Sequence, residues 1–411
     1  MQKLVRMNKF EKLGLSSEIV KALSEINIVE PSEIQEKTIK AALEGRDIIG
    51  GSATGSGKTL AFAAPIIQNL VPNEHVQALI LTPTRELAEQ ISSSFKAFSK
   101  YRPLEILSIY GGVDIERQIK KLKDADVVIA TPGRMLDHIS RRTIRLDKIR
   151  FLVLDEVDRM FDMGFYKDVR QIIERCGKER QTMMFSATIS ADLDYLAQKY
   201  TKNPLEVSVE SYVDPTKLKQ IYYDVPDFRK FSLLVHLLKN ENANLVMVFC
   251  GTKGNVDFVA HNLSLNGIHA KAIHGGLPQT KRTKVLEEFN SKNRMNVLVC
   301  TDVAARGLDI KGVSHVYNYD IPNDPKDYIH RIGRTARAGK DGIAINILSS
   351  RDYLKFGKIQ TNENLEITSV PLPNFPRVRI EIIKRKIDRK RPKNSDFAKK
   401  NKRFSRRKKF K

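Results

Sequence analysis

The stretch GSATGSGKT, residues 51–59, joins an apolar strand-like run, RDIIG (46–50), to a helix-like segment, KTLAFAAPIIQNLV (58–71). The phosphate-loop pattern G-x-x-x-x-G-K-[ST] asks for glycine where this chain has Ser52, and Gly51 comes one place too early. In such a loop, backbone N–H groups and the helix N-terminus face phosphate oxygens. Lys58 could reach the terminal phosphates and Thr59 could ligate Mg²⁺. The alternative is a glycine turn followed by a surface lysine.

From residue 46 to about 350, short apolar runs alternate with helix-patterned segments. This alternation predicts an α/β fold with parallel sheets covered by helices on both faces. The expected strands of the first half are residues 47–50, 78–82, 105–110, 126–130, 151–155 and 182–186. Those of the second half are residues 245–250, 270–274, 296–300, 315–319 and 344–348.

The pattern falters over EVSVESYVDPTKLKQ (206–220), which we interpret as a linker between two domains. The predicted organisation is an N-terminal domain (1–207), a linker (208–217), a C-terminal domain (218–366) and a tail (367–411). A chain of 411 residues is too long for one compact core, which agrees with two domains.

Composition excludes several classes of protein. No apolar run reaches the ~18 residues of a membrane span, and the N-terminus MQKLVRMNKFEKLG lacks the apolar segment of a signal peptide. We therefore expect a cytoplasmic protein without membrane contact. Cys176, Cys250 and Cys300 lack metal-ligand or redox-pair spacing, and the latter two lie in strand-like runs that predict buried thiols.

The net charge of +23 is concentrated at the C-terminus. Residues 377–411 contain 18 Lys and Arg against three acidic residues, with Phe397, Phe404 and Phe410 interleaved. From residue 384 on the segment is too charged to form a core, so we expect a disordered tail that binds a polyanion, above all nucleic acid, by counterion release and occasional stacking. The alternative is a solvated tail that only aids solubility.

The run FLVLDEVD (151–158) places two carboxylates where an apolar strand ends. At the carboxyl end of a sheet, Asp155 could hold Mg²⁺ and Glu156 could polarise an attacking water. The alternative is an acidic start to the following helix. Paired with the loop at 51–59, the two carboxylates favour nucleotide hydrolysis.

The chain resembles the DEAD-box family of superfamily 2 RNA helicases, through SATGSGKT, PTREL, TPGR, DEVD and SAT in this order. The resemblance implies two tandem RecA-like domains that use ATP and Mg²⁺ and act on RNA. It spans about residues 8–366, with an adenine-recognition segment within 8–36. The family has alanine where this chain has Ser52 and Val157, an aromatic at Ile28, and Thr-Pro at Ser32-Glu33.

The resemblance assigns residues to the nucleotide. Gln35 pairs with the adenine edge, which an amide suits because it both donates and accepts. Phe10 stacks on the base, or alternatively only anchors the N-terminal helix. The implied nucleotide contacts are Phe10, Gln35, Ala53, Thr54, Gly55, Ser56, Gly57, Lys58, Thr59, Gly307 and Asp309, with Thr59 and Asp155 on the metal.

HRIGRTARAG (330–339) resembles the family's arginine-finger segment. Its cations recur at three- and four-residue spacings, so a helix would present them on one face; a solvated basic helix is the alternative. The implied catalytic group comprises Lys58, Asp155, Glu156, His330, Arg334 and Arg337, and the implied coupling residues are Asp158, Ser186, Thr188 and Arg331. Arginines on a second domain would make hydrolysis depend on domain closure.

The resemblance also implies contacts with the RNA backbone from loops and helix starts that follow strands. These are Pro83, Thr84, Arg85, Gly111, Gly112, Thr131, Gly133, Arg134, Thr252, Gln279, Arg282 and Thr301. Few are aromatic, so we expect recognition of backbone and 2′-hydroxyl groups without sequence preference. The partners would be single-stranded or short duplex RNA, with ribonucleoprotein or ribosome-assembly partners, for a monomeric protein.

We therefore predict an ATP-dependent RNA helicase that couples hydrolysis to local strand separation or ribonucleoprotein remodelling. One alternative is an RNA-stimulated ATPase that clamps RNA without net unwinding. Another is an RNA chaperone that works through the basic tail and has a vestigial ATP site. A DNA helicase is a third.

Overall fold

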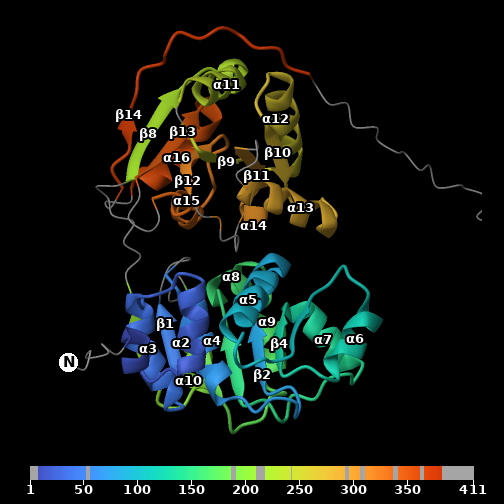
Figure 1. The fold of residues 1–411 in the computed structure, drawn as a ribbon. Helices are drawn as coiled ribbons and strands as arrows, with labels where there is room; N and C mark the ends of the chain where they lie inside the picture. Colours follow the sequence, from blue (N-terminus) through green and yellow to red (C-terminus); the bar gives the residue numbers. More distant parts are fainter. Residues whose placement is uncertain are drawn as a thin grey trace, which may run out of the picture. The chain divides into compact units, whose positions relative to one another are not determined.

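The computed structural model describes residues 8–51, 56–186, 191–209, 218–241, 243–291, 296–305, 310, 312–336, 341–361 and 365–381. The chain divides into a compact unit, Met1–Val378, and a C-terminal unit, Arg379–Lys411. The compact unit holds two α/β lobes, each built on its own seven-stranded sheet (Figure 1). Residues 382–411, for which we expect a disordered RNA-binding tail, lie outside the described residues.

The first lobe is a parallel sheet in the order β3-β4-β2-β5-β6-β1-β7. Its strands are β1 (Ile48–Gly51), β2 (Ala78–Leu81), β3 (Ile106–Ile109), β4 (Val127–Ala130), β5 (Phe151–Leu154), β6 (Gln181–Ser186) and β7 (Leu205–Ser208). Its helices are α1 (Lys9–Lys12), α2 (Ser17–Glu25), α3 (Glu33–Leu43), α4 (Lys58–Asn69), α5 (Arg85–Phe98), α6 (Ile115–Leu122), α7 (Pro132–Ser140), α8 (Val157–Asp162), α9 (Tyr166–Ile173) and α10 (Ala191–Tyr200).

Side chains of successive strand residues point to opposite faces, and both faces of this sheet are buried. Ile80 belongs to a core cluster that the residues of α1 to α5 complete, whereas Leu79 and Leu81 belong to a second cluster formed with α6 to α10. Both ends of each strand therefore lie at the rims of a closed three-layer sandwich. The rims, where strands give way to loops and helix starts, are where functional groups can gather.

The second lobe repeats the design with the strand order β10-β11-β9-β12-β13-β8-β14. Its strands are β8 (Leu218–Asp224), β9 (Leu245–Phe249), β10 (Ala270–Ile273), β11 (Val297–Cys300), β12 (Val313–Asn318), β13 (Gly342–Leu348) and β14 (Thr368–Ser369). Its α-helices are α11 (Lys230–Asn240), α12 (Lys253–Leu265), α13 (Gln279–Asn290), α14 (Asp302–Ala305), α15 (Pro325–Ile332) and α16 (Tyr353–Gln360). Two 3₁₀ turns, η1 (Asp227–Arg229) and η3 (Ser350–Asp352), complete it.

The predicted fold class is confirmed, since both sheets are parallel and both carry helices on each face. All eleven expected strands form. Three further strands were not expected: β7 and β8 overlap the two ends of the segment 206–220 that we interpreted as linker, and β14 lies in the expected tail. Of that segment, residues 210–217 lie outside the described residues.

The second lobe extends past residue 366, the boundary that the sequence suggested. Thr368 and Ser369 pair with Ile221 and Tyr222 of β8. Phe375 is 3% exposed and its carbonyl accepts a 2.6 Å hydrogen bond from Arg229, whose guanidinium lies 4.2 Å from the centre of the Phe375 ring. These contacts order the chain over the lobe up to Val378.

All three cysteines are buried thiols, as expected for Cys250 and Cys300. Burial raises the pKa of Cys176 to about 12, so a thiolate is disfavoured there. Among the described helices, none combines the length and the apolar character that a membrane crossing requires.

Candidate nucleotide and RNA sites

The predicted phosphate loop follows β1 at the carboxyl edge of the first sheet. Ala53, Thr54 and Gly55 lie outside the described residues. Gly57 has φ = 95° and precedes α4, whose first residues are Lys58 and Thr59. A Cβ at Gly57 would lie 2.3 Å from Gln35 Nε2 and 2.7 Å from Ser32 Oγ. Only glycine fits this position, because both the backbone conformation and the space exclude a side chain.

Gln35 and Ser32 hold the outer side of this loop. Gln35 Nε2 donates to the Gly57 carbonyl oxygen at 3.0 Å, and Gln35 Oε1 accepts from the Ser32 N–H at 3.0 Å. Ser32 Oγ donates to the Ser56 carbonyl oxygen at 2.6 Å. Ser32 is also the N-cap of α3, so serine serves here where the family has threonine. The predicted base-recognition residue therefore lies against the predicted phosphate loop.

Asp155 and Glu156 directly follow β5, two strands from β1 in the sheet, and both are buried. Burial raises the pKa of Asp155 to about 6, although the nearby Lys58 ammonium opposes the rise. Burial acts the same way on Glu156, but Arg159 and Lys58 outweigh it and lower the pKa of this carboxyl. Glu156 is thus held ionised by two cations.

The backbone at Glu156 is strained. Its φ of 52° and ψ of 53° are left-handed, which is rare for a residue with a side chain. Two contacts hold it: Asp155 Oδ1 accepts from the Glu156 N–H at 3.0 Å, and Arg159 Nη1 donates to Glu156 Oε2 at 2.9 Å. Val157 and Asp158 begin α8, and Val157 is fully buried among apolar side chains.

For the other predicted nucleotide contacts, the structure shows burial in two cases and does not describe the remaining residues. Phe10 is fully buried in the apolar cluster of α1 to α5, where it fits the alternative of an anchor for the N-terminal helix. Its stacking on a base stays a prediction. Ser186 ends β6 beside the phosphate loop strand and is 1% exposed. Thr188, Gly307 and Asp309 lie outside the described residues.

The predicted RNA contacts of the first lobe follow three adjacent strands, β2, β4 and β3. Thr84 is the N-cap of α5 and accepts from the Leu87 N–H at 3.3 Å. Pro83 and Arg85 flank it after β2; Thr131, Gly133 and Arg134 follow β4; Gly111 and Gly112 follow β3. The structure thus brings these eight residues of the sequence prediction to one half of the sheet edge.

Arg85 and Arg134 meet at the turn that holds Gly111 and Gly112. Gly112 has φ = 83°, and a Cβ there would lie 2.2 Å from Arg85 Nη1. Arg134 Nη1 donates to the Val113 carbonyl oxygen at 3.1 Å. Two guanidinium groups from different helices therefore pack against one glycine turn.

In the second lobe, Thr252, Gln279 and Thr301 follow β9, β10 and β11, which are adjacent strands. Thr252 is the N-cap of α12 and accepts from the Asn255 N–H at 3.1 Å, and Arg282 lies one turn after Gln279 on α13. The two lobes therefore present matching sets of helix starts, each at the carboxyl ends of three neighbouring strands.

The predicted arginine-finger segment begins in α15. Arg331 is 2% exposed and binds Asp302 through two contacts, from Nε at 2.5 Å and from Nη2 at 2.7 Å. Its Nη1 donates to the Asp320 carbonyl oxygen at 2.6 Å. Arg331 therefore ties the loops after β11 and β12 together. Arg334 Nε donates to the His330 carbonyl oxygen at 3.3 Å, and Arg337 lies outside the described residues.

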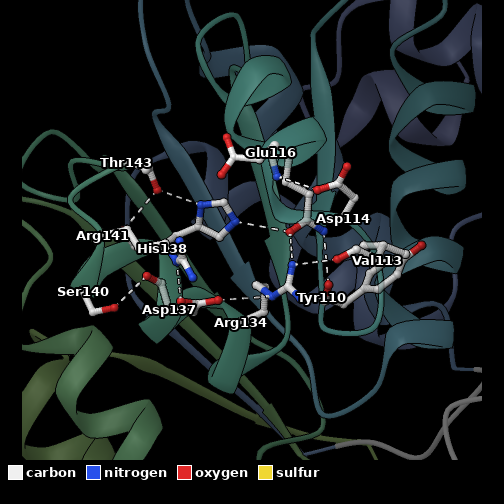
Figure 2. A network of polar contacts seen from close by, with 11 residues as sticks. Tyr110, Val113, Asp114, Glu116, Arg134, Asp137, His138, Ser140, Arg141 and Thr143 are labelled. Carbon is white, nitrogen blue, oxygen red and sulfur yellow. Dashed lines mark hydrogen bonds and ion pairs between the residues drawn. The ribbon is translucent and has the colours of Figure 1, made fainter.

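Sequence reasoning missed two buried residues behind Arg134. Figure 2 shows Arg134 and His138 on one face of α7, joined through a side chain that reaches from α6. That side chain is Gln118, whose Oε1 accepts from Arg134 Nη1 at 2.9 Å and lies 3.2 Å from His138 Nε2. The four-residue spacing of Arg134 and His138 is the signal that could have grouped them.

Comparisons with known proteins identify the family. A family model described as DEAD/DEAH box helicase matches residues 32–196, and one described as Helicase conserved C-terminal domain matches residues 229–339. The ATP-dependent RNA helicase CshA of Listeria monocytogenes is 44% identical over 370 residues, which cover 89% of this chain and 71% of the relative. The DEAD-box ATP-dependent RNA helicase CshA of Geobacillus kaustophilus is 43% identical over 372 residues, covering 90% and 79%.

Solved structures give the same result. Dbp5 of S. cerevisiae bound to RNA and ADP BeF3 superposes with a TM-score of 0.80 at 32% identity, covering 89% of this chain and 96% of that one. A DEAD box protein from Methanococcus jannaschii is 40% identical with a TM-score of 0.55, covering 89% and 99%. Two tandem α/β lobes, both family models and the extent of the identity agree, and the chain belongs to the DEAD-box family of ATP-dependent RNA helicases.

Proposed function

We propose that this chain hydrolyses ATP at the half of the first sheet edge formed by β5, β6 and β1, and grips RNA at the half formed by β3, β4 and β2. The observation that carries the proposal is the strand order, which sorts the two predicted sets of residues without mixing them. Ligands of open parallel sheets bind outside the carboxyl ends of the strands, where both sets lie.

In the nucleotide half, Lys58 would neutralise the terminal phosphates and Gln35 would read the adenine edge. Glu156 would orient and polarise the attacking water, a role that suits a carboxylate held ionised between Arg159 and Lys58. The tetrapeptide Asp155-Glu156-Val157-Asp158 is a variant of the family motif in which the buried valine replaces alanine and both carboxylates beside Glu156 remain.

The residues at this edge fit a bound Mg²⁺. Thr59 begins α4 directly after the phosphate loop, and Asp155 is a buried carboxylate within the influence of Lys58. Mg²⁺ is usually held by one or two carboxylate or hydroxyl ligands together with substrate phosphates, so Thr59 and Asp155 are a sufficient protein contribution. When bound, the ion would neutralise charge that develops on the transferring phosphoryl group.

The second lobe would supply His330, Arg334 and Arg337 when RNA and ATP bring the lobes together. Guanidinium groups stabilise the charge of phosphoryl transfer, so their arrival would make turnover depend on RNA. RNA would contact Thr84, Arg85, Gly111, Gly112 and Arg134 on the first lobe, with Thr252, Gln279, Arg282 and Thr301 on the second. Backbone contacts of this kind give affinity without sequence preference.

Glu156→Gln tests the proposal. The substitution keeps the size of the side chain and removes its charge, so RNA-stimulated ATP turnover should fall by at least about a hundredfold, the usual weight of general-base catalysis. RNA binding with a non-hydrolysed ATP analogue should persist. Strand displacement should be lost together with ATP turnover. If strand displacement survives, it does not depend on this site and the alternative of a tail-driven RNA chaperone is correct.

A further inference from the structure

Gln118 on α6 is an interior residue that joins three segments of the first lobe. It is 5% exposed. Its Nε2 donates to the Tyr110 carbonyl oxygen at 3.1 Å, and its Oε1 accepts from Arg134 Nη1 at 2.9 Å (Figure 2). One amide therefore connects the glycine turn after β3, helix α6 and helix α7.

His138 supplies the third contact of the Gln118 amide, and its proton position follows from the other two. The Tyr110 carbonyl can only accept, so the amide nitrogen of Gln118 must face it and the amide oxygen must face Arg134 and His138. That oxygen also only accepts, so His138 Nε2, 3.2 Å away, carries a proton. Thr143 Oγ1 lies 2.8 Å from His138 Nδ1 and 3.1 Å from the His138 carbonyl oxygen, and its one proton can go to either acceptor. A neutral ring with its proton on Nε2 matches these partners.

The charged ring is disfavoured at this position. His138 is fully buried, and burial together with the Arg134 guanidinium lowers the pKa of the imidazole. The neutral His138 acts as a fixed hydrogen-bond donor to Gln118.

The other side of this network faces the residues assigned to RNA. Arg134 Nη1 donates to the Val113 carbonyl oxygen as well as to Gln118, and Arg134 Nε lies 3.7 Å from Asp137 Oδ2. Gln118 and Arg134 each hold one end of the Tyr110–Val113 turn by a carbonyl oxygen. The glycines of the turn therefore lie between two anchored carbonyls, with Arg85 packed against Gly112.

We propose that Gln118 and His138 are positioning residues for RNA binding. They hold Arg134 and the Gly111–Gly112 turn in the geometry that grips the RNA backbone, without touching RNA themselves. A preorganised cation and turn lose less freedom on binding, so the network raises affinity for RNA and leaves the chemistry of ATP unchanged. This inference rests on the proposed function, in which Arg134 contacts RNA.

The main test is Gln118→Met, which keeps the length and apolar volume of the side chain and removes all three hydrogen bonds. ATP turnover is measured against RNA concentration. The RNA concentration for half-maximal stimulation should rise roughly tenfold, the effect expected when a buried donor and a charged donor lose their partner. Turnover at saturating RNA and the KM for ATP should stay within about twofold of the wild type. An equal loss in all three quantities, or no change in half-saturation, overturns the inference.

A pair of substitutions at His138 separates positioning from packing. His138→Gln can place an amide N–H where Nε2 lies and should restore half-saturation to near the wild-type value. His138→Leu fills the space without a donor and should weaken RNA binding several-fold. If the two variants behave alike, the hydrogen bond carries nothing and the inference fails. Ser140→Ala, an exposed position of α7, is the matched control and should change neither value.

Arg134→Ala distinguishes failure of the inference from failure of the proposed function. If Arg134→Ala leaves RNA half-saturation unchanged, the RNA site itself is wrongly assigned. If it weakens RNA binding while Gln118→Met does not, only the positioning role is wrong. In the double variant the loss should be smaller than the sum of the two single losses, because Gln118 acts partly through Arg134 and partly through the Tyr110 carbonyl. Additive losses overturn the inference.

Discussion

Nε2 of Gln35 donates a 3.0 Å hydrogen bond to the carbonyl oxygen of Gly57, so the predicted base-recognition segment and the predicted phosphate loop are joined directly. The oxygen of the same amide accepts from the Ser32 N–H and closes the N-terminus of α3. Both polar atoms of Gln35 already have protein partners. Each retains a second bonding position, one proton and one lone pair, for the adenine edge.

Gln35→Ala should therefore cost both ATP affinity and stability. Losing the base contact should raise the dissociation constant for ATP about tenfold, or about 1.4 kcal/mol. Losing the cap contact should lower the free energy of unfolding by about 1 kcal/mol. Calorimetric titration and urea denaturation measure the two effects. Gln68→Ala is the control, since Gln68 bonds the Ser16 N–H and the Gly14 carbonyl away from the loop. If the control weakens ATP binding equally, the effect is not specific to the base.

Gly57→Ala should abolish tight nucleotide binding, because the methyl group would meet Gln35 and Ser32 inside ordinary contact distance. We expect at least about a tenfold loss of ATP affinity, because the clash and the backbone strain of a positive φ both disfavour alanine at this position. Gly45→Ala is the control for backbone strain alone, because Gly45 has φ = 82° and an added Cβ there would meet no atom within 4 Å. Fluorescent nucleotide titration of both variants checks this. Equal affinity in the two variants would mean that the contact with Gln35 is irrelevant.

The second lobe depends on a buried ion pair that no RNA or ATP assignment uses. Lys230 is fully buried and its Nζ lies 2.6 Å from Asp352 Oδ2, which also accepts from the Ser349 N–H and hydroxyl. Asp352→Ala leaves the lysine charge unpaired and should destabilise the lobe by about 3–5 kcal/mol.

Adding Lys230→Met to Asp352→Ala should recover part of the lost free energy of unfolding, because it removes the buried ammonium that Asp352→Ala leaves unpaired. Urea denaturation followed by circular dichroism gives both numbers. A double variant as unstable as Asp352→Ala alone would show that the cost comes from the lost Ser349 contacts.

Stability should depend on pH through His138. Its pKa is lowered in the folded protein, so below the unfolded value of about 6.5 the unfolded chain binds more protons. The contribution of neutral His138 to the free energy of unfolding is fully present above the unfolded pKa. It is lost as pH falls from about 6.5 toward the folded pKa. His138→Gln cannot titrate, so its free energy of unfolding should fall less between pH 7 and pH 5. Parallel curves for the two proteins would contradict this assignment.

Strands buried on both faces could be predicted from the sequence, as could the edge strands β3 and β10, whereas β7, β8 and β14 could not. Runs such as those of β2 and β5 are wholly apolar because helices cover both sides. By contrast, β7 and β8 alternate buried and exposed residues near one edge of their sheets, and Asp214-Pro215 between them looks like a linker. Their pairing partners are far away in the chain, so no local pattern indicates them.

The site was predictable where a motif encodes contact with a ligand. Lys58, Asp155 and Arg134 belong to such motifs, whereas Gln118 and His138 act through other protein groups. A buried glutamine looks like any surface glutamine until the fold brings Tyr110 and Arg134 to it. Phe10 illustrates the opposite limit, since its position in the chain fits both base stacking and core packing, and burial favours the latter.

The pairing of β2 with β5 fixes the distance between the predicted RNA-binding residues that follow β2 and the predicted catalytic carboxylates that follow β5. The Asp155 N–H donates to the Leu81 carbonyl oxygen at 3.0 Å, immediately before the segment that leads to Arg85. Neighbouring strands lie about 4.8 Å apart whatever loops follow them. Insertions after β3 or β4 can therefore change how a descendant of this chain binds RNA. The spacing between the predicted ATP and RNA sites would be inherited unchanged, because the paired strands set it.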